Sequence, residues 1–554
     1  MLIFNLQAYQ RNYKLCPYLS FMFFIVGILW LATTEATPKA SVVLSNFAKF
    51  SPTTPTKSSI ELEATTPATE LFANSIKLTM EKAQWGRALA NNLTLLYRKT
   101  HTDVIEGIDD CIELLDDSVE QLSNVVNDKS KEYSFHNIDD VQTWLSAALT
   151  NQGTCLESLE KYSKIDKGII GVLANNMSQL ISNSLSVYMS AKPKIKGKTT
   201  KLTSGNGGGS RRLLSEGFPY WLLKSERRLL EASIAEIGAD AVVAMDGSGT
   251  HRTIGEALTL AASLAGGGRS VIHVKAGTYN ENIMIPTKQK NVMLVGDGKG
   301  KTVIVGNRNS DDGWTTYQSA TVGAMGDGFI ARDITFVNNA GPAKHQAVSL
   351  RVGSDKSVIF RCSILGYQDT LYTHSKRQFY RETDIYGTVD FIFGNSAVVF
   401  QNCNIYVRKP PSGQQNYIIA QGRSNPNQNT GISLHNCKIT AASDLVAVRS
   451  KFETFLGRPW QQYSRTVIMQ SFLDDLIHPS GWSPWSGGFA LKTLYFGEYM
   501  NSGPGASTRA RVKWQGYHAS LTSIEAQGFT VGGFIGGNLW LPSTGVSFDS
   551  GLLG

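Results

Sequence analysis

Short strand-like segments recur at nearly constant spacing in the second half of the chain. The strings CSIL, TDIY and CNIY place Ile364, Ile385 and Ile405 at successive steps of 21 and 20 residues, and Ile439 in CKIT follows after a longer step that contains a loop. Strands that repeat about every twenty residues predict a right-handed parallel β-helix, in which stacked coils bring aliphatic side chains into an interior ladder. The spacing therefore predicts a mainly β fold for this half.

Two aspartates, Asp369 and Asp390, are separated by one such step. If the coils keep register, their backbones lie about 4.8 Å apart and the two carboxyl groups stand side by side. Like charges at that distance do not ionise together easily, so the pair predicts one acid and one carboxylate in a single site. The alternative is structural, with Asp369 capping a turn and Asp390 ending a strand.

Five short motifs surround this pair in a fixed order. They are GTYNE at 277–281, QAVSL at 346–350, GYQDTL at 366–371, DFIFG at 390–394 and LGRPW at 456–460. Together the motifs resemble the catalytic core of plant pectin methylesterases, also called pectinesterases or aspartyl esterases. The resemblance implies a carboxylic ester hydrolase that acts on methyl-esterified homogalacturonan, the main polymer of pectin. Such an enzyme would release methanol and leave pectate during plant cell wall modification.

The resemblance also implies a role for the polar residues of the motifs. Asp390, kept ionised by its neighbours, is similar to the nucleophile that attacks the ester carbonyl carbon. Asp369, whose pKa the charge of Asp390 raises, is similar to the acid that protonates methanol and the base that then activates water. Gln368 would stabilise the oxyanion through its amide N–H groups, and Gln346 would offer a second amide to the substrate. A stacked amide ladder is the structural alternative for both glutamines.

Four further residues are expected to contact the substrate. Arg458 would lie near Asp390 and a galacturonate carboxylate, and Trp460 offers a flat apolar face to a sugar ring. Thr316, in the string DGWTTYQSAT, matches a substrate-contacting threonine of the family, while Phe393 would either line the cleft or lie in the core. The sequence has no His, Cys and carboxylate cluster with metal-ligand spacing and no phosphate loop, so no metal or cofactor is expected.

The charge of the chain fits an anionic partner. The formal net charge is +8 and the pI is about 9.0, which favours nucleic acid, membrane surfaces or acidic polysaccharide. The basic residues are dispersed and no nucleic-acid motif is present, so pectin is the expected partner and nucleic acid is not.

Two other functions stay open. Paired carboxylates about 5 Å apart would also suit a retaining glycosidase that acts on pectin. The two amide donors argue against it, and release of methanol or of new reducing ends would separate the two reactions. The second alternative is a catalytically silent wall-binding or inhibitor protein whose helical domain is the working part.

The N-terminal region has the pattern of a secretory leader. Arg11 and Lys14 precede an apolar run at 19–31 and a stretch of small residues, which is typical of a signal peptide within residues 1–36. A signal anchor is the alternative. Residues 37–69 are rich in Ser, Thr and Pro and predict a flexible linker. We therefore expect a protein secreted to the cell wall, or a precursor anchored to a membrane of the secretory pathway.

Helical periodicity replaces this composition over residues 70–190. Apolar residues follow the i, i+3, i+4, i+7 pattern from Ile108 to Leu122 and again from Val141 to Ala148, which predicts an antiparallel helical bundle.

The strings DCIELLDDSVEQL and WLSAALTNQGTCLESL resemble the pro-region of these esterases, which is similar to invertase and pectin methylesterase inhibitors. The resemblance implies a Cys111–Cys155 disulfide that joins two helices. The family's other cysteine pair is absent, so inhibition by this domain stays open, and a folding or transport aid is the alternative. A separate inhibitor protein is a further candidate partner.

Residues 191–230 predict a second linker, because a basic stretch and a Gly-rich stretch precede two copies of RRLL at 211–214 and 227–230. Exposed basic sites in a flexible linker are accessible to proteases. The resemblance implies that a processing protease cuts there and releases a catalytic domain of residues 231–554. Asn92 and Asn176 lie in Asn-X-Ser/Thr patterns and are candidate glycosylation sites.

The cysteines give an independent expectation about the coils. Cys362, position 383, Cys403 and Cys437 each lie two residues before a ladder isoleucine, so their side chains should stack in one column. Adjacent coils bring such side chains within disulfide range, which predicts a Cys403–Cys437 bond. Thr383 stands where family members commonly have a cysteine, so we expect Cys362 to be a free, buried thiol.

Overall fold

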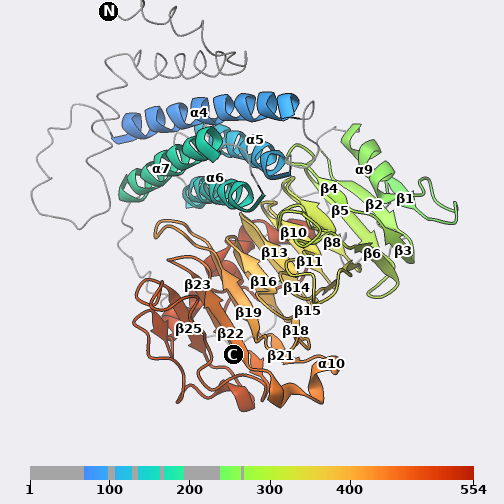
Figure 1. The fold of residues 1–554 in the computed structure, drawn as a ribbon, viewed down its shortest axis with the longest axis vertical. Coiled ribbons are helices and arrows are strands. Elements are labelled where there is room, and N and C mark those ends of the chain that lie inside the picture. Colours follow the sequence, from blue (N-terminus) through green and yellow to red (C-terminus); the bar gives the residue numbers. More distant parts are fainter. Residues whose placement is uncertain (1–67, 98–105, 128–134, 163–166, 192–237, 264–267) are drawn as a thin grey trace, which may run out of the picture. The chain divides into compact units, whose positions relative to one another are not determined.

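The computed structural model describes residues 68–97, 106–127, 135–162, 167–191, 238–263 and 268–554 (Figure 1). The expected leader, the Ser/Thr/Pro-rich linker and the linker with both RRLL motifs lie outside these residues, as does the start of the catalytic domain at Glu231. Within the described part of the chain, no helix combines the length and the apolar character that a membrane crossing requires.

The first described residues form four long helices (Figure 1): α4 (Ala68–Tyr97), α5 (Glu106–Asn127), α6 (Phe135–Tyr162) and α7 (Lys167–Ala191). Helix α5 packs against α4 and α6, and α7 packs against the same two helices. Their apolar faces share one core of buried side chains, including Ile76, Leu115, Leu122, Val141, Leu145, Leu173, Met177 and Leu185. The Cys111–Cys155 disulfide joins α5 to α6. The expected helical bundle and its disulfide are thus confirmed.

The chain from Ala241 onward coils through three parallel sheets. An eleven-stranded sheet contains β1 (Ala241–Val243), β2 (Ser270–Val274), β5 (Val292–Gly296), β8 (Ile330–Arg332), β11 (Ser357–Phe360), β14 (Arg377–Arg381), β17 (Ala397–Gln401), β20 (Gly431–His435), β23 (Arg465–Met469), β25 (Tyr495–Tyr499) and β26 (Tyr517–His518). A seven-stranded sheet contains β4 (Ile283–Ile285), β7 (Val322–Ala324), β10 (Leu350–Val352), β13 (Leu371–Thr373), β16 (Ile392–Gly394), β19 (Asn416–Gln421) and β22 (Thr454–Pro459). An eight-stranded sheet contains β3 (Gly277–Asn280), β6 (Thr302–Gly306), β9 (Thr335–Asn338), β12 (Ser363–Leu365), β15 (Asp384–Gly387), β18 (Asn404–Val407), β21 (Lys438–Ala441) and β24 (Phe472–Leu473).

Short helices lie before, between and after these coils. They are α9 (Ile254–Ser263), α10 (Ser443–Val446), η2 (Arg449–Lys451), η3 (Pro504–Ala506), α11 (Ser523–Gln527), α12 (Val531–Phe534), η4 (Gly537–Leu539) and η5 (Leu541–Thr544).

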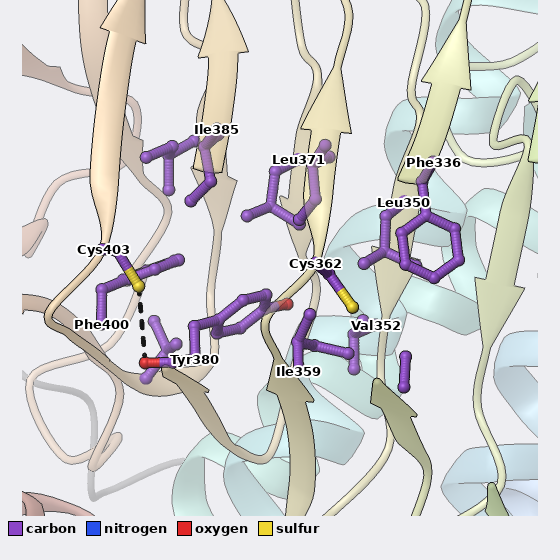
Figure 2. Packing of buried hydrophobic residues seen from close by; sticks show 14 of the residues in the cluster. Phe336, Leu350, Val352, Ile359, Cys362, Leu371, Tyr380, Ile385, Phe400 and Cys403 are labelled. Carbon is purple, nitrogen blue, oxygen red and sulfur yellow. Dashed lines mark hydrogen bonds between the residues drawn. The ribbon is translucent and has the colours of Figure 1, made fainter. Parts of the chain in front are cut away.

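The interior of the coils is the aliphatic ladder expected from the sequence. Ile364 pairs with Ile385, Ile385 with Ile405, and Ile405 with Ile439 on successive strands of the eight-stranded sheet. Each of these isoleucines is fully buried. Figure 2 shows Leu350 and Leu371 from neighbouring strands, with Phe336 of the eight-stranded sheet in the same buried cluster. The parallel β-helix predicted from the spacing is therefore confirmed.

From β8 to β24, each coil passes from the eleven-stranded to the eight-stranded sheet through only two residues, whereas five residues, 297–301, join β5 to β6. The first of the two adopts a left-handed backbone conformation, as at Glu382 (φ 53), Asn402 (φ 56) and Asn436 (φ 54). The second points into the core, as Cys403 and Cys437 do. This corner keeps its length from β8 to β24, so it fixes the register of the strands that it joins there.

The cysteine column forms as predicted, but without the predicted disulfide. Cys362 is a buried free thiol, as expected, and Thr383 beside it donates its hydroxyl to the carbonyl of Ile359. Cys403 and Cys437 are also free and buried. Their thiols donate to backbone carbonyls, Cys403 to Tyr380 at 3.6 Å (Figure 2) and Cys437 to Phe400 at 3.4 Å. Each sulfur is directed at the backbone of a preceding coil, so the prediction of a Cys403–Cys437 bond was wrong for this structure.

Candidate active site

Asp369 and Asp390 occupy equivalent positions on neighbouring coils. Each comes two residues before a strand of the seven-stranded sheet, and Leu371 of β13 pairs with Ile392 of β16. The peptide N–H of Asp369 donates to the carbonyl of Val389 at 3.0 Å. The separation by one coil that the sequence predicts is therefore confirmed.

Both aspartates have a left-handed backbone, with φ values of 59° and 49°. This conformation costs about 1–2 kcal/mol for most residues other than glycine, although aspartate tolerates it better than most. Both residues are also buried, with exposed fractions of 8% and 6%. Backbone strain and a buried carboxyl group at two adjacent positions are the kind of cost that proteins retain at functional sites.

Arg458 binds Asp390 through two parallel hydrogen bonds. Arg458, on β22, donates from Nε to Oδ1 at 2.8 Å and from Nη2 to Oδ2 at 2.5 Å. Its guanidinium carbon lies 4.0 Å from the ring centre of Tyr417 and 4.4 Å from that of Trp485. The two rings and the bidentate geometry hold the guanidinium in one orientation.

Burial and this ion pair act on Asp390 in opposite directions. Burial raises the pKa of Asp390 above its ordinary value, and the hydrogen bonds and charge of Arg458 oppose that rise. The sequence led us to expect that its neighbours keep Asp390 ionised. The structure adds that removal from water works against them, so the carboxylate depends on Arg458.

A cavity of about 380 Å³ opens over the two aspartates. It collects all of the residues that the sequence singled out for the site: Thr316, Gln346, Gln368, Asp369, Asp390, Phe393, Arg458 and Trp460. These residues come from segments up to 144 residues apart in the chain, from Thr316 to Trp460, so their meeting in one cavity is a result of the coil register.

Gln346 is held in a defined orientation. The hydroxyl of Ser310 donates to Gln346 Oε1 at 2.6 Å, and the backbone of Ser310 donates to the carbonyl of Gln346 at 3.0 Å. With its oxygen accepting from Ser310, the amide directs its N–H donors elsewhere. Gln368 lines the same cavity and is half-buried. Both side chains can therefore supply N–H groups to a developing negative charge.

Aromatic rings form an apolar wall of the cavity. Tyr372 stacks on Phe393 with ring centres 4.2 Å apart, and Trp460 meets Phe393 edge-on at 5.8 Å. Phe393 is 4% exposed and lines the cavity, so it both packs in the interior and borders the cleft. Such a wall can face the apolar side of a sugar ring.

Several residues of the site did not emerge from the sequence. Tyr372 pairs in register with Phe393, so the one-coil step could have identified it. Trp485 lies in a long connection after β24, where no periodic pattern reveals its position. Thr154, Glu157 and Ser158 of helix α6 also line the cavity, and no pattern in the sequence connects this helix to the aspartates.

Helix α6 contacts the β-helix through a row of hydroxyl side chains. Thr143, Thr150 and Thr154 share one face of the helix and bond to Asn429, Asn395 and His374 at 2.9, 2.9 and 3.1 Å. Apolar residues of α5, α6 and α7, such as Ile108, Leu159 and Ile170, belong to the same buried cluster as Tyr317, Tyr372 and Phe393. The helical bundle is therefore packed against the wall of the cavity.

Comparison with known protein families identifies both parts of the chain. The model of the family described as Pectinesterase matches residues 240–538, more than half of the chain. The chain belongs to the pectinesterase family. A second model, described as Plant invertase/pectin methylesterase inhibitor, matches residues 51–187 of this pectinesterase.

Curated relatives and a solved structure agree with this membership. A probable pectinesterase/pectinesterase inhibitor from Arabidopsis thaliana is 58% identical over 536 residues, which cover 96% of this chain and 97% of the relative. Pectinesterase 2 from Citrus sinensis is 56% identical and covers 74% and 76% of the two chains. The structure of a pectin methylesterase from carrot aligns with a TM-score of 0.56 and 56% identity, over 58% of this pectinesterase and 99% of the carrot chain.

This pectinesterase is a carboxylic ester hydrolase that acts on pectin. The alignment accounts for 99% of the carrot chain with 58% of this chain, so the carrot structure has no counterpart of the remaining residues. Among the residues that the structure describes, no group of three or more His, Cys, Asp or Glu side chains could hold a metal ion.

Proposed function

We propose that this pectinesterase cleaves galacturonate methyl esters through a covalent intermediate on Asp390. The observation that carries the proposal is the in-register pair of Asp369 and Asp390, of which only Asp390 is held by the bidentate Arg458. The pair thus contains one carboxyl group fixed by a cation and a second carboxyl group beside it, which is the arrangement that a nucleophile and an acid/base need.

The reaction begins with attack of Asp390 on the carbonyl carbon of the methyl ester. The carbonyl electrons move to the oxygen, and the amide N–H groups of Gln346 and Gln368 donate to the oxyanion that forms. The C–O bond to the methoxy group then breaks, and Asp369 gives its proton to the departing methanol. The product of this half is an acid anhydride between Asp390 and the galacturonate carboxyl group.

In the second half, the ionised Asp369 removes a proton from water, which attacks the galacturonyl carbonyl of the anhydride. The same amides stabilise the second oxyanion, and its collapse releases the free galacturonic acid and restores the Asp390 carboxylate. Asp369 ends protonated, ready for the next ester. Arg458 orients the nucleophile throughout and is placed to meet a neighbouring galacturonate carboxylate.

A retaining glycosidase would use a similar carboxylate pair, but the surroundings favour the esterase. Amide donors held as Gln346 is by Ser310 serve a developing oxyanion, whereas glycoside cleavage passes through a positively charged, oxocarbenium-like state. The family membership favours the same reaction.

Methanol release from highly methylated pectin tests the mechanism. The portion from Glu231 onward should release methanol, and Asp390→Asn should not, while new reducing ends should stay at background in both. Folded protein that yields reducing ends without methanol would overturn the esterase mechanism. An Asp390→Asn variant that retains activity would remove Asp390 from the role of nucleophile.

We also propose that the helical bundle limits access to the cavity in the precursor. The supporting observation is that Thr154, Glu157 and Ser158 of α6 form part of the cavity wall beside the two aspartates. The full chain should release methanol more slowly than the same chain cut within residues 191–230. Equal rates would leave the bundle as a folding or transport aid.

The remaining steps of maturation follow from the proposed domain limits. A leader within residues 1–36 would direct the chain to the secretory pathway, and a protease acting at 211–214 or 227–230 would release residues 231–554 into the cell wall. Asn92 and Asn176 are both exposed on the bundle, which fits their proposed glycosylation. N-terminal sequencing of the secreted protein tests which RRLL motif is cut.

A further inference from the structure

A second, larger cavity lies beside the β-helix and has no lining residue in common with the catalytic one. It encloses about 920 Å³, within the range of sites that bind small molecules. Its β-helix wall carries four cationic side chains, Lys356, Arg377, Arg423 and Arg465, and no carboxylate. The two lining carboxylates, Asp139 and Asp140, both come from helix α6.

Arg465 lies in this wall without an ion-pair partner among the described residues. Its Nε donates to the carbonyl of Thr430 at 2.7 Å, and in the described part of the chain no carboxylate lies within ion-pair distance of it. Arg423 donates to the carbonyl of Gln428 at 2.9 Å and likewise has no carboxylate partner there. Burial lowers the pKa of Arg465 to about 9, and the nearby charge of Arg423 adds to the effect.

The backbones of the two arginines are fixed side by side by a shared acceptor. The peptide N–H groups of Arg423 and Arg465 both donate to Oε1 of Gln421, at 3.0 and 2.7 Å. Two guanidinium groups held together without a counterion are unfavourable unless an anion joins them, because burial weakens their hydration. The arrangement is therefore suited to a ligand that carries negative charge.

Apolar rings stand next to these cations. Phe534 and Trp540 line the cavity, and the guanidinium carbon of Arg465 lies 5.4 Å from the ring centre of Phe534. A sugar acid has a carboxylate at one edge and apolar C–H faces on its ring. Cations beside aromatic faces match both features.

The position on the strands relates this cavity to the catalytic one. Ala420 on β19 lines the catalytic cavity, and Arg423, three residues later, lines the second. Three residues of extended chain span about 10 Å. The product of the esterase reaction, a galacturonan stretch with free carboxylates, is therefore generated in a cavity whose lining strand leads directly to Arg423.

We propose that the Arg423–Arg465 cavity is a second binding site for the carboxylates of de-esterified galacturonan. The inference rests on the proposed function, since that reaction supplies the ligand. Arg377 is shared with the bundle, because it pairs with Asp140 of α6 at 2.6 Å as well as with Asp355 at 2.5 Å. Departure of the bundle removes Asp139 and Asp140 and leaves the wall purely cationic, so the site is stronger in the released β-helix.

Titration calorimetry with fully de-esterified trigalacturonate tests the site in residues 238–554. The unsubstituted portion should bind two molecules, one in each cavity. Arg465→Gln should still bind one molecule in the catalytic cavity. Its affinity for the second molecule should fall by at least about tenfold, the amount that one charge-assisted contact supplies. Arg458→Gln should instead weaken the catalytic-cavity site. Arg509→Gln, an exposed position outside both cavities, should match the unsubstituted protein.

Two further experiments separate a loss of binding from a loss of folding. If Arg465→Gln does not fold, Lys356→Gln at an exposed position should still weaken the second site several-fold. In an Asp390→Asn background, fully methylated trigalacturonate should leave the second site empty, because it carries no free carboxylate. Identical binding by Arg465→Gln and Arg509→Gln would overturn the proposal. A separate assay of methanol release tests the proposed function. Absence of methanol release by the unsubstituted portion would overturn that function.

Discussion

Two buried ion pairs in this pectinesterase differ in which part of the chain supplies the partners. Arg458 and Asp390 both belong to the β-helix. Lys376 of the β-helix binds Asp117 of helix α5 at 2.8 Å and Asp327 at 3.1 Å, and the Lys376 and Asp117 side chains are fully buried. The first pair is independent of the bundle, whereas the second spans both parts. The ion pair of the active site therefore belongs to the β-helix alone. The attachment of the bundle, in contrast, depends on charged side chains from the bundle and from the β-helix.

The largest effect is expected from breaking the pair inside the β-helix. Asp390→Asn keeps the shape of the side chain but removes the nucleophile, so methanol release should fall by at least about 10³-fold. Rates on methylated pectin, with thermal unfolding as the control for folding, measure this. Activity within tenfold of the unsubstituted enzyme would contradict the role of Asp390.

Breaking the Lys376–Asp117 pair should weaken the attachment of the bundle to the β-helix and leave ester hydrolysis unchanged. Loss of one partner of a buried charge pair costs about 2–5 kcal/mol, so Asp117→Asn should weaken retention of the bundle strongly after the linker is cut. Gel filtration of the cut chain measures how much bundle stays bound. Lys376→Met removes the same contact from the other side and separates this effect from any change within the bundle.

A matched control for attachment is Glu120→Gln. Glu120 on α5 pairs with Lys290 of the β-helix, but both side chains are accessible to water. Exposed pairs contribute up to about 1 kcal/mol, so this variant should retain its bundle nearly as well as the unsubstituted chain. Equal release by Glu120→Gln and Asp117→Asn would show that burial does not distinguish the two contacts.

The pH dependence of the reaction should reveal how the first pair works. Burial raises the pKa of Asp390 and Arg458 opposes the rise, so removing the guanidinium in Arg458→Gln should raise the pKa further. Attack requires the carboxylate, and the acidic limb of the kcat/KM profile should therefore move to higher pH. An unchanged limb with a uniformly lower rate would assign Arg458 to substrate binding alone.

A smaller, pH-dependent effect is expected at the bundle. Asp110 on α5 is fully buried, and burial raises its pKa to about 7 from 3.8, against hydrogen bonds from Ser158, Thr315 and Gln318 and the charge of Arg351. A raised pKa means that packing favours the protonated form. The contribution of the protonated Asp110 to the stability of the packed bundle is complete below about pH 3.8 and is lost as the pH rises through about 7.

Retention of the bundle after linker cleavage should therefore decrease between pH 5.5 and pH 8. Asp110→Asn, which stays neutral, should reduce this change several-fold. The same gel-filtration assay at the two pH values measures it. If Asp110→Asn shows the full pH dependence, other groups at the interface cause it.

The sequence was most informative where the fold is periodic. The steps between Ile364, Ile385 and Ile405 predicted the ladder, and the equal step from Asp369 to Asp390 predicted their adjacency. Motif resemblance predicted further residues of the catalytic cavity, including Arg458, because each motif lies at a fixed position on a coil.

The sequence was least informative where contacts join parts without a common period. Thr154 on α6 and His374 on the β-helix are 220 residues apart and meet only through packing of two separate folds. The thiols of Cys403 and Cys437 lie in the predicted column, yet their orientation toward backbone carbonyls depends on side-chain torsions that a spacing rule does not contain. The same holds for Arg465, whose lack of an ion pair with any described carboxylate appears only in three dimensions.

The two-residue corner between the eleven-stranded and eight-stranded sheets also determines where the chain can gain length. From Cys403 to Cys437 the coil grows to 34 residues, yet the corners at 402–403 and 436–437 keep their two residues. The additional residues enter the connections 408–415 and 422–430 on either side of β19, and β19 itself has six residues where β16 has three. New residues can therefore be inserted at either end of β19, the strand that brings Ala420 to the cavity, without displacing the aspartates.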